Sequence, residues 1–309
     1  MTDLQKSTVV KGSIAVGISA ILWGFDGVVL TPQLFRLPVV YVVFILHLVP
    51  FFFMNFFLFK EYRLLGSMKK SDLIYFLLVS LFGGAIGTLA IVKALFLLEF
   101  NHLSIVVLLQ KLQPVFAISL AAILLKEKIR QYFVFWASIA VISGYFLTFG
   151  LQWPDFSTGS KTIQAALLAL LAAFSFGSST VFSKKILTSY NFVTSTFFRY
   201  GITTLIMLGF MLAFGDFNSL KETSGREWFF IFLIGSTTGS GAIFLFYYGL
   251  KKVKAIMATI SELLFPISAV LFDYLINGSV LSAVQWLAAA LMVLAIIRLN
   301  AKAEQKKIS

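Results

Sequence analysis

The chain contains no cysteine, only two histidines and only 13 acidic residues in a length of 309. The absence of cysteine excludes disulfide bonds and thiol chemistry, and two histidines far apart in the sequence provide no metal-binding motif. The phosphate-binding pattern Gly-x-x-x-x-Gly-Lys-Ser/Thr, which would indicate ATP hydrolysis, is also missing. Since no pairing of nucleophile and base stands out either, the sequence predicts a protein that is not an enzyme, with no catalytic residues, metal or cofactor.

Charged residues are scarce as well, at 12%, about half of their share in an average soluble domain. Hydrophobic residues make up 59% of the chain, and the mean hydropathy is +0.94. This composition predicts a polytopic protein embedded in the lipid bilayer, with no loop long enough to form a soluble domain. The net charge of +12 does not indicate a nucleic-acid partner, because the Lys and Arg residues lie in short loops, where they set membrane topology.

Ten segments are apolar over about the 20 residues that a helix needs to cross a bilayer. Short loops with Pro, Gly, Asn or charged residues separate them, such as Thr31-Pro32 and Asn277-Gly278-Ser279. The sequence therefore predicts an all-α membrane protein with ten transmembrane helices, at residues 12–30, 39–59, 73–97, 103–125, 131–150, 162–182, 193–213, 228–249, 255–276 and 282–299.

Positive charge is distributed unevenly between the two sides of this predicted bundle. Most of the Lys and Arg residues, including those near both termini, fall on one side, whereas the other side holds Arg36, Lys161, Lys221 and Arg226. Because cytoplasmic loops carry the excess of Lys and Arg, we expect both termini to be cytoplasmic. The expected location is the inner, or plasma, membrane of a bacterium.

The two halves of the sequence resemble each other when one is shifted by about 152 residues. The matches include Gly83 and Gly87 with Gly235 and Gly239, Pro114 with Pro266, His47 with Arg199, Gln110 with Glu262 and, with one more residue of shift, Ala20 and Gly24 with Ala173 and Gly177. They indicate a duplicated five-helix unit, residues 12–150 and 162–299. Since five is odd, the second copy is inverted in the membrane, an arrangement that places a transporter's substrate site between the halves, near the midplane.

These features resemble the EamA-type transporters of the drug/metabolite transporter (DMT) superfamily. The resemblance rests on Trp23-Gly24-Phe25 in the first span, on Pro114 followed by Lys126-Glu127-Lys128 after the fourth, and on the duplication. Glu127 matches the Glu of the family's Gly-Glu-Arg-like turn, whereas Ser279 stands where the second half would repeat it. The resemblance implies ten helices, small organic solutes as cargo and a central cavity lined by spans 1, 3, 4, 6, 8 and 9. It also implies that spans 5 and 10 are peripheral, where they could form a homodimer.

Lys111 and Glu262 are opposite charges within the predicted fourth and ninth spans. A charge near the centre of a bilayer costs roughly 3 kcal/mol or more, so such a residue usually has a partner or a function. A zwitterion could bridge them, with its carboxylate on Lys111 and its amine on Glu262. The alternative is a structural ion pair. Glu262 is also the main candidate for proton coupling. Pro114 and Pro266 each leave the backbone carbonyl one turn earlier without its helical partner.

Further polar and aromatic residues of the spans are candidates for the same cavity. Gln110 and Gln113 share one helix face beside Lys111 and are expected to line it. Trp23 and Tyr247 are the candidate aromatic contacts, although Tyr247 could instead belong to an interfacial aromatic belt. Asp26, near the outer end of the first span, is a candidate for gating or coupling, or a solvated residue. Arg199 is expected to extend towards the inner surface, as long basic side chains do.

The predicted function is secondary active transport, by alternating access, of a small polar or zwitterionic metabolite similar to an amino acid. Two alternatives remain open at this point. One is an exchanger of nucleotide-like metabolites such as S-adenosylmethionine, which the positive charges within the spans favour slightly. The other is a lipid scramblase, which soluble solutes would not saturate. A small-molecule substrate and the lipid bilayer are the expected partners.

Overall fold

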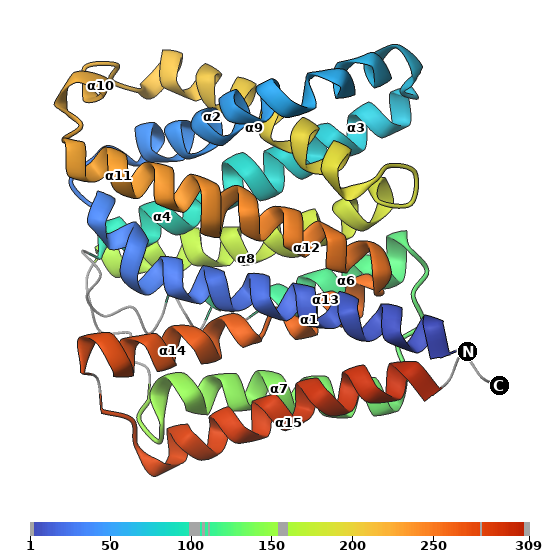
Figure 1. Cartoon of the computed structure of the whole chain (residues 1–309). Coiled ribbons are helices and arrows are strands. Elements are labelled where there is room, and N and C mark those ends of the chain that lie inside the picture. Colours follow the sequence, from blue (N-terminus) through green and yellow to red (C-terminus); the bar gives the residue numbers. More distant parts are fainter. Residues whose placement is uncertain are drawn as a thin grey trace.

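The computed structural model describes residues 3–98, 106, 109–110, 112–153, 160–278 and 280–305 (Figure 1). Within these ranges the regular structure is entirely helical, without a strand. The α-helices are α1 (Asp3–Phe25), α2 (Val39–Leu58), α3 (Lys70–Val79), α4 (Gly87–Leu97), α6 (Gln113–Leu124), α7 (Gln131–Phe149), α8 (Ser160–Ile186), α9 (Phe192–Phe214), α10 (Ser219–Glu222), α11 (Gly225–Ile234), α12 (Ser240–Lys252), α13 (Ala255–Ser261), α14 (Leu264–Asn277) and α15 (Ala283–Gln305).

Several of these helices continue one another through short segments of different winding. Three segments are π-helical, namely η1 (Asp26–Leu30), η4 (Ser80–Ile86) and η5 (Gly235–Gly239). Two are 3₁₀-helical, namely η2 (Thr31–Leu34) and η3 (Phe59–Ser67). The segment η4 joins α3 to α4, and η5 joins α11 to α12, so each trio forms one long rod.

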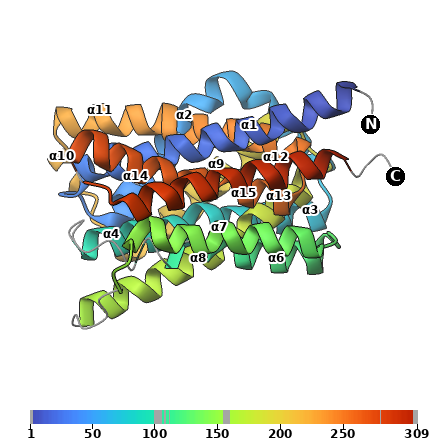
Figure 2. The ribbon, with the colours of Figure 1, turned by 90° about the horizontal axis from the view of Figure 1, so that it is seen from below.

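Seven helical rods in the described part of the chain are long and apolar enough to cross a membrane. Three shorter apolar helices, Gln113–Leu124, Gln131–Leu147 and Ala283–Leu299, occupy the predicted fourth, fifth and tenth segments. The rods run roughly parallel to one another in Figures 1 and 2, and α1 begins at the same end of the bundle at which α15 finishes. The protein is therefore a multi-pass helical membrane protein, as the sequence predicts.

Glycines lie in the π-segments η4 and η5. Gly83 and Gly84 lie in η4, and Gly235 and Gly239 are the first and last residues of η5. A π-helix is a rare winding that appears mostly at functional sites, and glycine lowers the cost of leaving regular α-geometry. The glycine pairs of the sequence thus mark local irregularities of two spans as well as close packing.

Two other helices begin beside a proline. The helix α13 ends at Ser261 and α14 begins at Leu264, two residues before Pro266. On the other side, α6 begins at Gln113 and has Pro114 in its first turn. Because proline has no backbone N–H and clashes with the preceding turn, it favours a break at these places. In a bilayer, such a break is tolerated only where protein or a polar cavity surrounds it.

Small residues bring pairs of helices into close contact. A methyl group added to Gly24 of α1 would lie 2.9 Å from the Phe265 carbonyl oxygen of α14. One added to Gly177 of α8 would lie 2.8 Å from the carbonyl oxygen of Gln113. Helices in membranes commonly associate through small residues in this way. Consequently α1 lies directly against α14, and α8 lies directly against α6.

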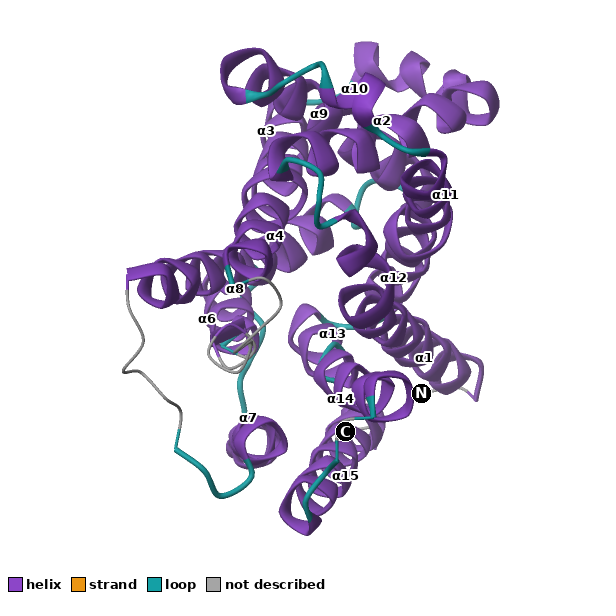
Figure 3. Ribbon diagram, turned by 90° about the vertical axis from the view of Figure 1, so that its left-hand side faces the viewer, coloured by secondary structure: helices purple, strands orange, loops and turns teal. Residues whose placement is uncertain are grey.

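Figure 3, which looks along the helices, shows α7 and α15 on one flank of the bundle and α2, α3 and α9 on the opposite flank. The helices α7 and α15 pack along each other, as do α2 and α9. The remaining long helices α1, α8 and α12 lie between these two groups.

Polar contacts join distant parts of the chain at both ends of the bundle. At one end, Arg36 makes a two-pronged ion pair with Glu227, with N–O distances of 3.1 and 2.9 Å. Glu227 also forms a capping box with Ser224 at the start of α11, a Ser-x-x-Glu pattern readable in the sequence. At the opposite end, Glu127 accepts hydrogen bonds from the backbone N–H groups of Ala255 and Ile256, at 3.0 and 3.1 Å. Glu127 therefore caps α13 from the loop that follows α6.

The close packing of η4 can be tested by adding a single methyl group. At Gly84 a methyl would lie 2.6 Å from Cγ2 and 2.9 Å from Cβ of Thr203 on α9, whereas at Gly209 it would meet open space. We expect Gly84→Ala to destabilise the protein by about 1–3 kcal/mol through overpacking and Gly209→Ala to leave it as stable or slightly more so. Thermal unfolding in detergent measures both, and equal unfolding temperatures would contradict the tight contact.

The cap on α13 predicts a second stability effect. Replacing Glu127 by Ala removes both acceptors and a favourable charge from the helix N-terminus, which should cost about 1–2 kcal/mol. The exposed Glu222 provides a matched acidic control, as Glu222→Ala. A lower unfolding temperature for Glu127→Ala alone is the expected result, and an equal effect of the two substitutions would show that the cap contributes nothing specific.

Candidate functional site

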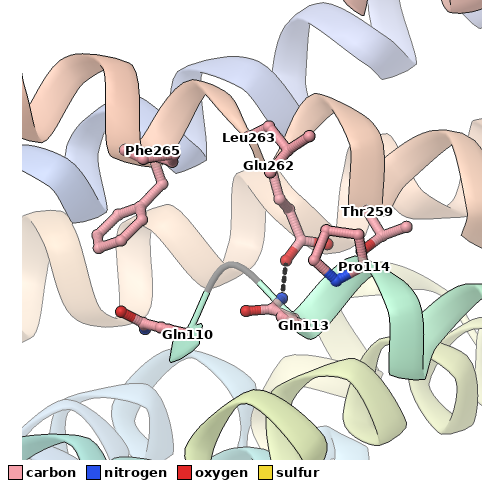
Figure 4. Close-up of a pocket in the computed structure, with 8 residues that line it drawn as sticks. Gln110, Gln113, Pro114, Thr259, Glu262, Leu263 and Phe265 are labelled. Carbon is pink, nitrogen blue, oxygen red and sulfur yellow. Dashed lines mark hydrogen bonds between the residues drawn. The ribbon is translucent and has the colours of Figure 1, made fainter. Parts of the chain in front are cut away.

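A pocket lies between the two interrupted helices (Figure 4). Its described lining comes from two stretches, with Gln110, Gln113 and Pro114 on one side and Thr259, Glu262 and Phe265 on the other. Each side therefore contributes the proline-associated break of a helix and the polar residues beside it. The structure thus brings together three of the residues that the sequence analysis selected, Gln110, Gln113 and Glu262.

Glu262 is the acidic group of this pocket, and its carboxylate is held from two directions. It caps the C-terminal end of α13, so its side chain leaves the helix at the break. Gln113 Nε2 donates to Glu262 Oε2 at 2.6 Å, the bond drawn in Figure 4. Thr180 Oγ1 of α8 donates to Oε1 at 3.4 Å. These donors come from α6 and α8, so Glu262 links three helices.

The ion pair found among the described residues joins Arg36 to Glu227. No described Lys or Arg side chain therefore lies within ion-pair distance of Glu262. Its hydrogen bonds come from neutral groups, an amide and a hydroxyl, which allow the carboxyl group to lose or gain a proton without breaking an ion pair. Lys111, the predicted partner of Glu262, lies outside the residues that the structure describes. The bridging of the two charges therefore stays a prediction.

Apolar surface completes the pocket. The ring of Phe265 and the amide of Gln110 lie on the same side of the Gln113–Glu262 bond in Figure 4. Leu263 and the two proline rings add further apolar lining. A few placed polar groups on a mainly apolar wall are the usual composition of a small-molecule site.

Trp23 and Tyr247 are not among the described residues that line this pocket. The Trp23 ring packs against Phe246, with 5.4 Å between ring centroids. Tyr247 is 1% exposed and its hydroxyl group contacts Ser183 Oγ at 2.8 Å. In this conformation, Trp23 and Tyr247 therefore lie outside the pocket.

Arg199 does not extend to the inner surface, so that expectation is wrong. The side chain is only 7% exposed and turns into the bundle. Its guanidinium donates to the Gly83 carbonyl oxygen of η4 at 2.9 Å and to the Tyr247 hydroxyl at 3.1 Å, and it lies over the Tyr247 ring. Tertiary contacts that satisfy the charge internally outweigh the access to water that extension would provide.

Sequence reasoning underestimated Arg199, although one signal pointed to it. The half-to-half comparison pairs Arg199 with His47, and both are buried. His47 packs its ring against Tyr200, the residue after Arg199, with 5.2 Å between centroids. A polar residue at the same place in both halves is a stronger indication of an internal role than either residue alone.

A chain of polar contacts connects Arg199 with the pocket. Arg199 donates to Tyr247, Tyr247 contacts Ser183 on α8, and Thr180, one turn away on α8, donates to Glu262. This series of contacts links five parts of the bundle: the rod of α3 and α4 at Gly83, α9 at Arg199, α12 at Tyr247, α8 at Ser183 and Thr180, and the end of α13 at Glu262. A shift of any of these helices would alter the surroundings of Glu262.

Asp26 lies apart from the described pocket lining, at the start of the π-segment η1. Its Oδ1 accepts a hydrogen bond from Thr31 at 3.3 Å. In the described part of the chain, no group of three or more His, Cys, Asp and Glu side chains is arranged to hold a metal ion.

Known proteins share both the sequence and the fold. The sequence profile of the EamA-like transporter family matches the chain twice, at residues 10–150 and 163–301. The chain is 51% identical over 295 residues to "Riboflavin transporter ImpX" of Fusobacterium nucleatum subsp. nucleatum (strain ATCC 23726 / VPI 4351), a match that covers 94% of this chain and 98% of that protein.

A solved crystal structure of another protein has the same fold, with a TM-score of 0.66 at 17% sequence identity, over 96% of this chain and 98% of that one. The two matches of the profile together span nearly the whole sequence. The chain belongs to the EamA-like transporter family of the drug/metabolite transporter superfamily, so it is a membrane transporter and not an enzyme.

Proposed function

We propose that this protein carries riboflavin, or a closely related flavin, across a bacterial inner membrane by alternating access. The observation that carries the proposal is the 51% identity, over almost the full length of both chains, to a protein named as a riboflavin transporter. The proposed binding site is the polar pocket around Gln113 and Glu262, whose cavity of about 30 Å³ in this conformation has to widen to admit a flavin.

The chemistry of the pocket suits a flavin. The isoalloxazine ring is flat and largely apolar, and one edge alternates carbonyl groups with an N–H. The Gln110 amide offers donors and an acceptor to such an edge, the Gln113 amide offers its oxygen and the N–H that does not bond Glu262, and Phe265 offers an aromatic face to the ring. Glu262 can accept a hydrogen bond from the ring N–H or from a ribityl hydroxyl group.

A flavin changes the role expected of the two charges. Riboflavin has neither an ammonium nor a carboxylate group, so it does not require the bridge between Lys111 and Glu262 that an amino acid would use. Lys111 stays a predicted substrate contact through its hydrogen-bond donors. A nucleotide-like substrate resembles a flavin more closely than an amino acid does, and both classes remain outcomes of the test.

We further propose that the fold is ten transmembrane helices in two inverted repeats, residues 12–150 and 162–299. The two matches of the family profile support the duplication. Corresponding places in the halves carry the same irregularity: η4 corresponds to η5, and the break before Pro114 corresponds to the break before Pro266. With α1 starting where α15 ends, the chain crosses an even number of times.

The helix–helix contacts also match when each helix is replaced by its counterpart in the other half. The contact of α1 with α14 corresponds to that of α8 with α6, and the contact of α1 with α12 corresponds to that of α8 with the rod of α3 and α4. The pairs α2 with α9 and α7 with α15 each correspond to themselves. A pseudo-two-fold axis in the membrane plane has this consequence, and it places the pocket between related halves.

In the proposed mechanism the halves rock about this pocket. The Arg36–Glu227 ion pair would close the outer side, and the Glu127 cap on α13 would close the inner side. Glu262 and Asp26 are the candidates for coupling or gating, and Trp23 and Tyr247 would meet the substrate in another state.

Both termini are proposed to be cytoplasmic. The outer faces of α7 and α15, which expose Phe135, Ile142, Leu287 and Leu291, are the proposed homodimer surface.

Counterflow in proteoliposomes tests the substrate. Vesicles loaded with unlabelled riboflavin should take up labelled riboflavin through the purified protein, and excess unlabelled alanine or S-adenosylmethionine should not compete. Empty liposomes and loaded liposomes without protein are the controls. Counterflow of labelled alanine or labelled S-adenosylmethionine, in vesicles loaded with the same unlabelled compound and without any riboflavin counterflow, would instead support one of the earlier hypotheses.

The pocket predicts the effect of three substitutions on this assay. Gln113→Ala removes both a proposed substrate contact and the 2.6 Å bond to Glu262, so the half-saturating riboflavin concentration should rise roughly five- to tenfold, the loss of one to two hydrogen bonds. Glu262→Gln should reduce transport at least as strongly. Gln164→Ala, at an exposed position of α8, is the matched control, and equal transport by all three variants would exclude this pocket.

A further inference from the structure

Asp26 is a carboxyl group within a membrane-crossing helix, and it has no basic partner in the described structure. It lies in the candidate span Ser7–Leu34. Among the described residues the ion pair found is Arg36 with Glu227, so no described Lys or Arg lies within 4 Å of Asp26. An ionised carboxylate is costly in a bilayer unless something neutralises it. Asp26 is half-buried, and a proton or a metal cation bound to it would remove the cost of an ionised carboxylate wherever the bilayer excludes water.

The backbone around Asp26 is irregular on two sides. Asp26 begins the π-segment η1 of the first span, and this span packs against the π-segment η5 of the rod formed by α11 and α12. In transporters, irregular helix segments supply backbone oxygens to coupling cations near the substrate site. Two such segments meet here, one from each half of the chain.

A spare hydroxyl group completes the arrangement. Thr238 lies in η5, is 2% exposed, and has a buried Oγ1 without a hydrogen-bond partner. The first span, which carries Asp26, packs against η5, the segment that carries Thr238. Thr31, 8% exposed, contributes a second hydroxyl at 3.3 Å from Asp26 Oδ1. A buried oxygen with free lone pairs beside an uncompensated carboxylate is a feature that a bound cation would explain.

We propose that Asp26, Thr31 and Thr238 form a site for a monovalent cation, Na⁺ or a proton, whose gradient drives transport. A single carboxylate with neutral oxygens suits one positive charge, and the described part of the chain has no cluster of three or more acidic or His side chains for a divalent ion. The site is separate from the Gln113–Glu262 pocket, and its role in driving transport rests on the proposed function.

The other titratable and charged groups near Asp26 are already engaged. On α9, the Tyr200 ring packs against His47, and Arg199 is bound to Gly83 and Tyr247. On α11, Glu227 is paired with Arg36. On α14, Asp273 accepts a hydrogen bond from Asn277 at 2.7 Å. Asp26, which is half-buried, has neither a basic side chain nor a side-chain amide among its described partners.

The test compares accumulation with exchange in the same proteoliposomes. Riboflavin uptake is followed with an inward Na⁺ gradient at equal pH, with an inward proton gradient without Na⁺, and with neither, at a fixed membrane potential. One cation per substrate at 100 mV supports roughly 50-fold accumulation. Wild type should accumulate riboflavin under one of the two gradients. Asp26→Asn should reach only equal concentrations, while its counterflow stays within about twofold of wild type.

Two further variants sharpen the result. Asp273→Asn removes a carboxylate near the same end of a span and should accumulate like wild type. Thr238→Val keeps the shape but removes the spare oxygen. It should raise the half-activating Na⁺ concentration at least fivefold if Na⁺ is the cation, and leave the pH dependence unchanged if the cation is a proton. If Asp26→Asn is not recovered as a monodisperse protein, Asp26→Glu replaces it and should shift the half-activating cation concentration.

Three results would overturn the proposal. In the first, Asp26→Asn accumulates riboflavin as strongly as wild type. In the second, wild type responds to neither gradient although its counterflow is intact. In the third, folded Asp26→Asn loses both counterflow and accumulation. The proposed function fails separately, if wild type shows no riboflavin counterflow at all. In that case the gradients are applied with whichever cargo does exchange, so the cation site is still tested.

Discussion

A bilayer offers no water to the polar groups of the backbone, and the rest of this structure follows from that constraint. It accounts for the helical content of the described chain and for the scarcity of charges. It also makes every irregularity informative, because an unpaired carbonyl or a broken helix persists only where other groups compensate. Among the described residues the irregularities include three π-segments, two 3₁₀-segments and the helix starts beside Pro114 and Pro266.

The breaks before Pro114 and Pro266 face each other across one pocket. At Pro114 the helix α6 begins at Gln113, and at Pro266 the helix α13 ends at Ser261 while α14 begins at Leu264, so Glu262 lies between two helices. Gln113 and Glu262 meet there at 2.6 Å because both lie at such a break. Regular helices would have presented the same residues on fixed faces, separated by the backbone of the intervening turns.

Buried charge is handled differently at different places. Arg199 donates to a carbonyl oxygen and a tyrosine hydroxyl, without a described carboxylate and with its buried Nε left unpaired, while Glu262 accepts from an amide and a hydroxyl. The ion pair found in the described structure, Arg36 with Glu227, lies at the end of the bundle. Interior charges bound only by neutral groups cost less to rearrange than a buried ion pair, in which removing one partner leaves an uncompensated charge. A transporter that changes conformation benefits from this arrangement.

The sequence by itself determined that this is a multi-pass helical membrane protein, because apolar length and charge-bearing loops are local properties, and its motifs indicated the EamA-like family. It also selected Gln110, Gln113 and Glu262, since a polar residue beside a proline in an apolar segment is readable without a fold. Only the tertiary structure decided that Arg199 turns inward, that Tyr247 and Trp23 lie outside the pocket, and that Thr238 is left with a spare hydroxyl near Asp26. These outcomes depend on which helices lie side by side, and contacts between residues more than a hundred positions apart, such as Arg199 with Gly83, leave no local pattern in the chain.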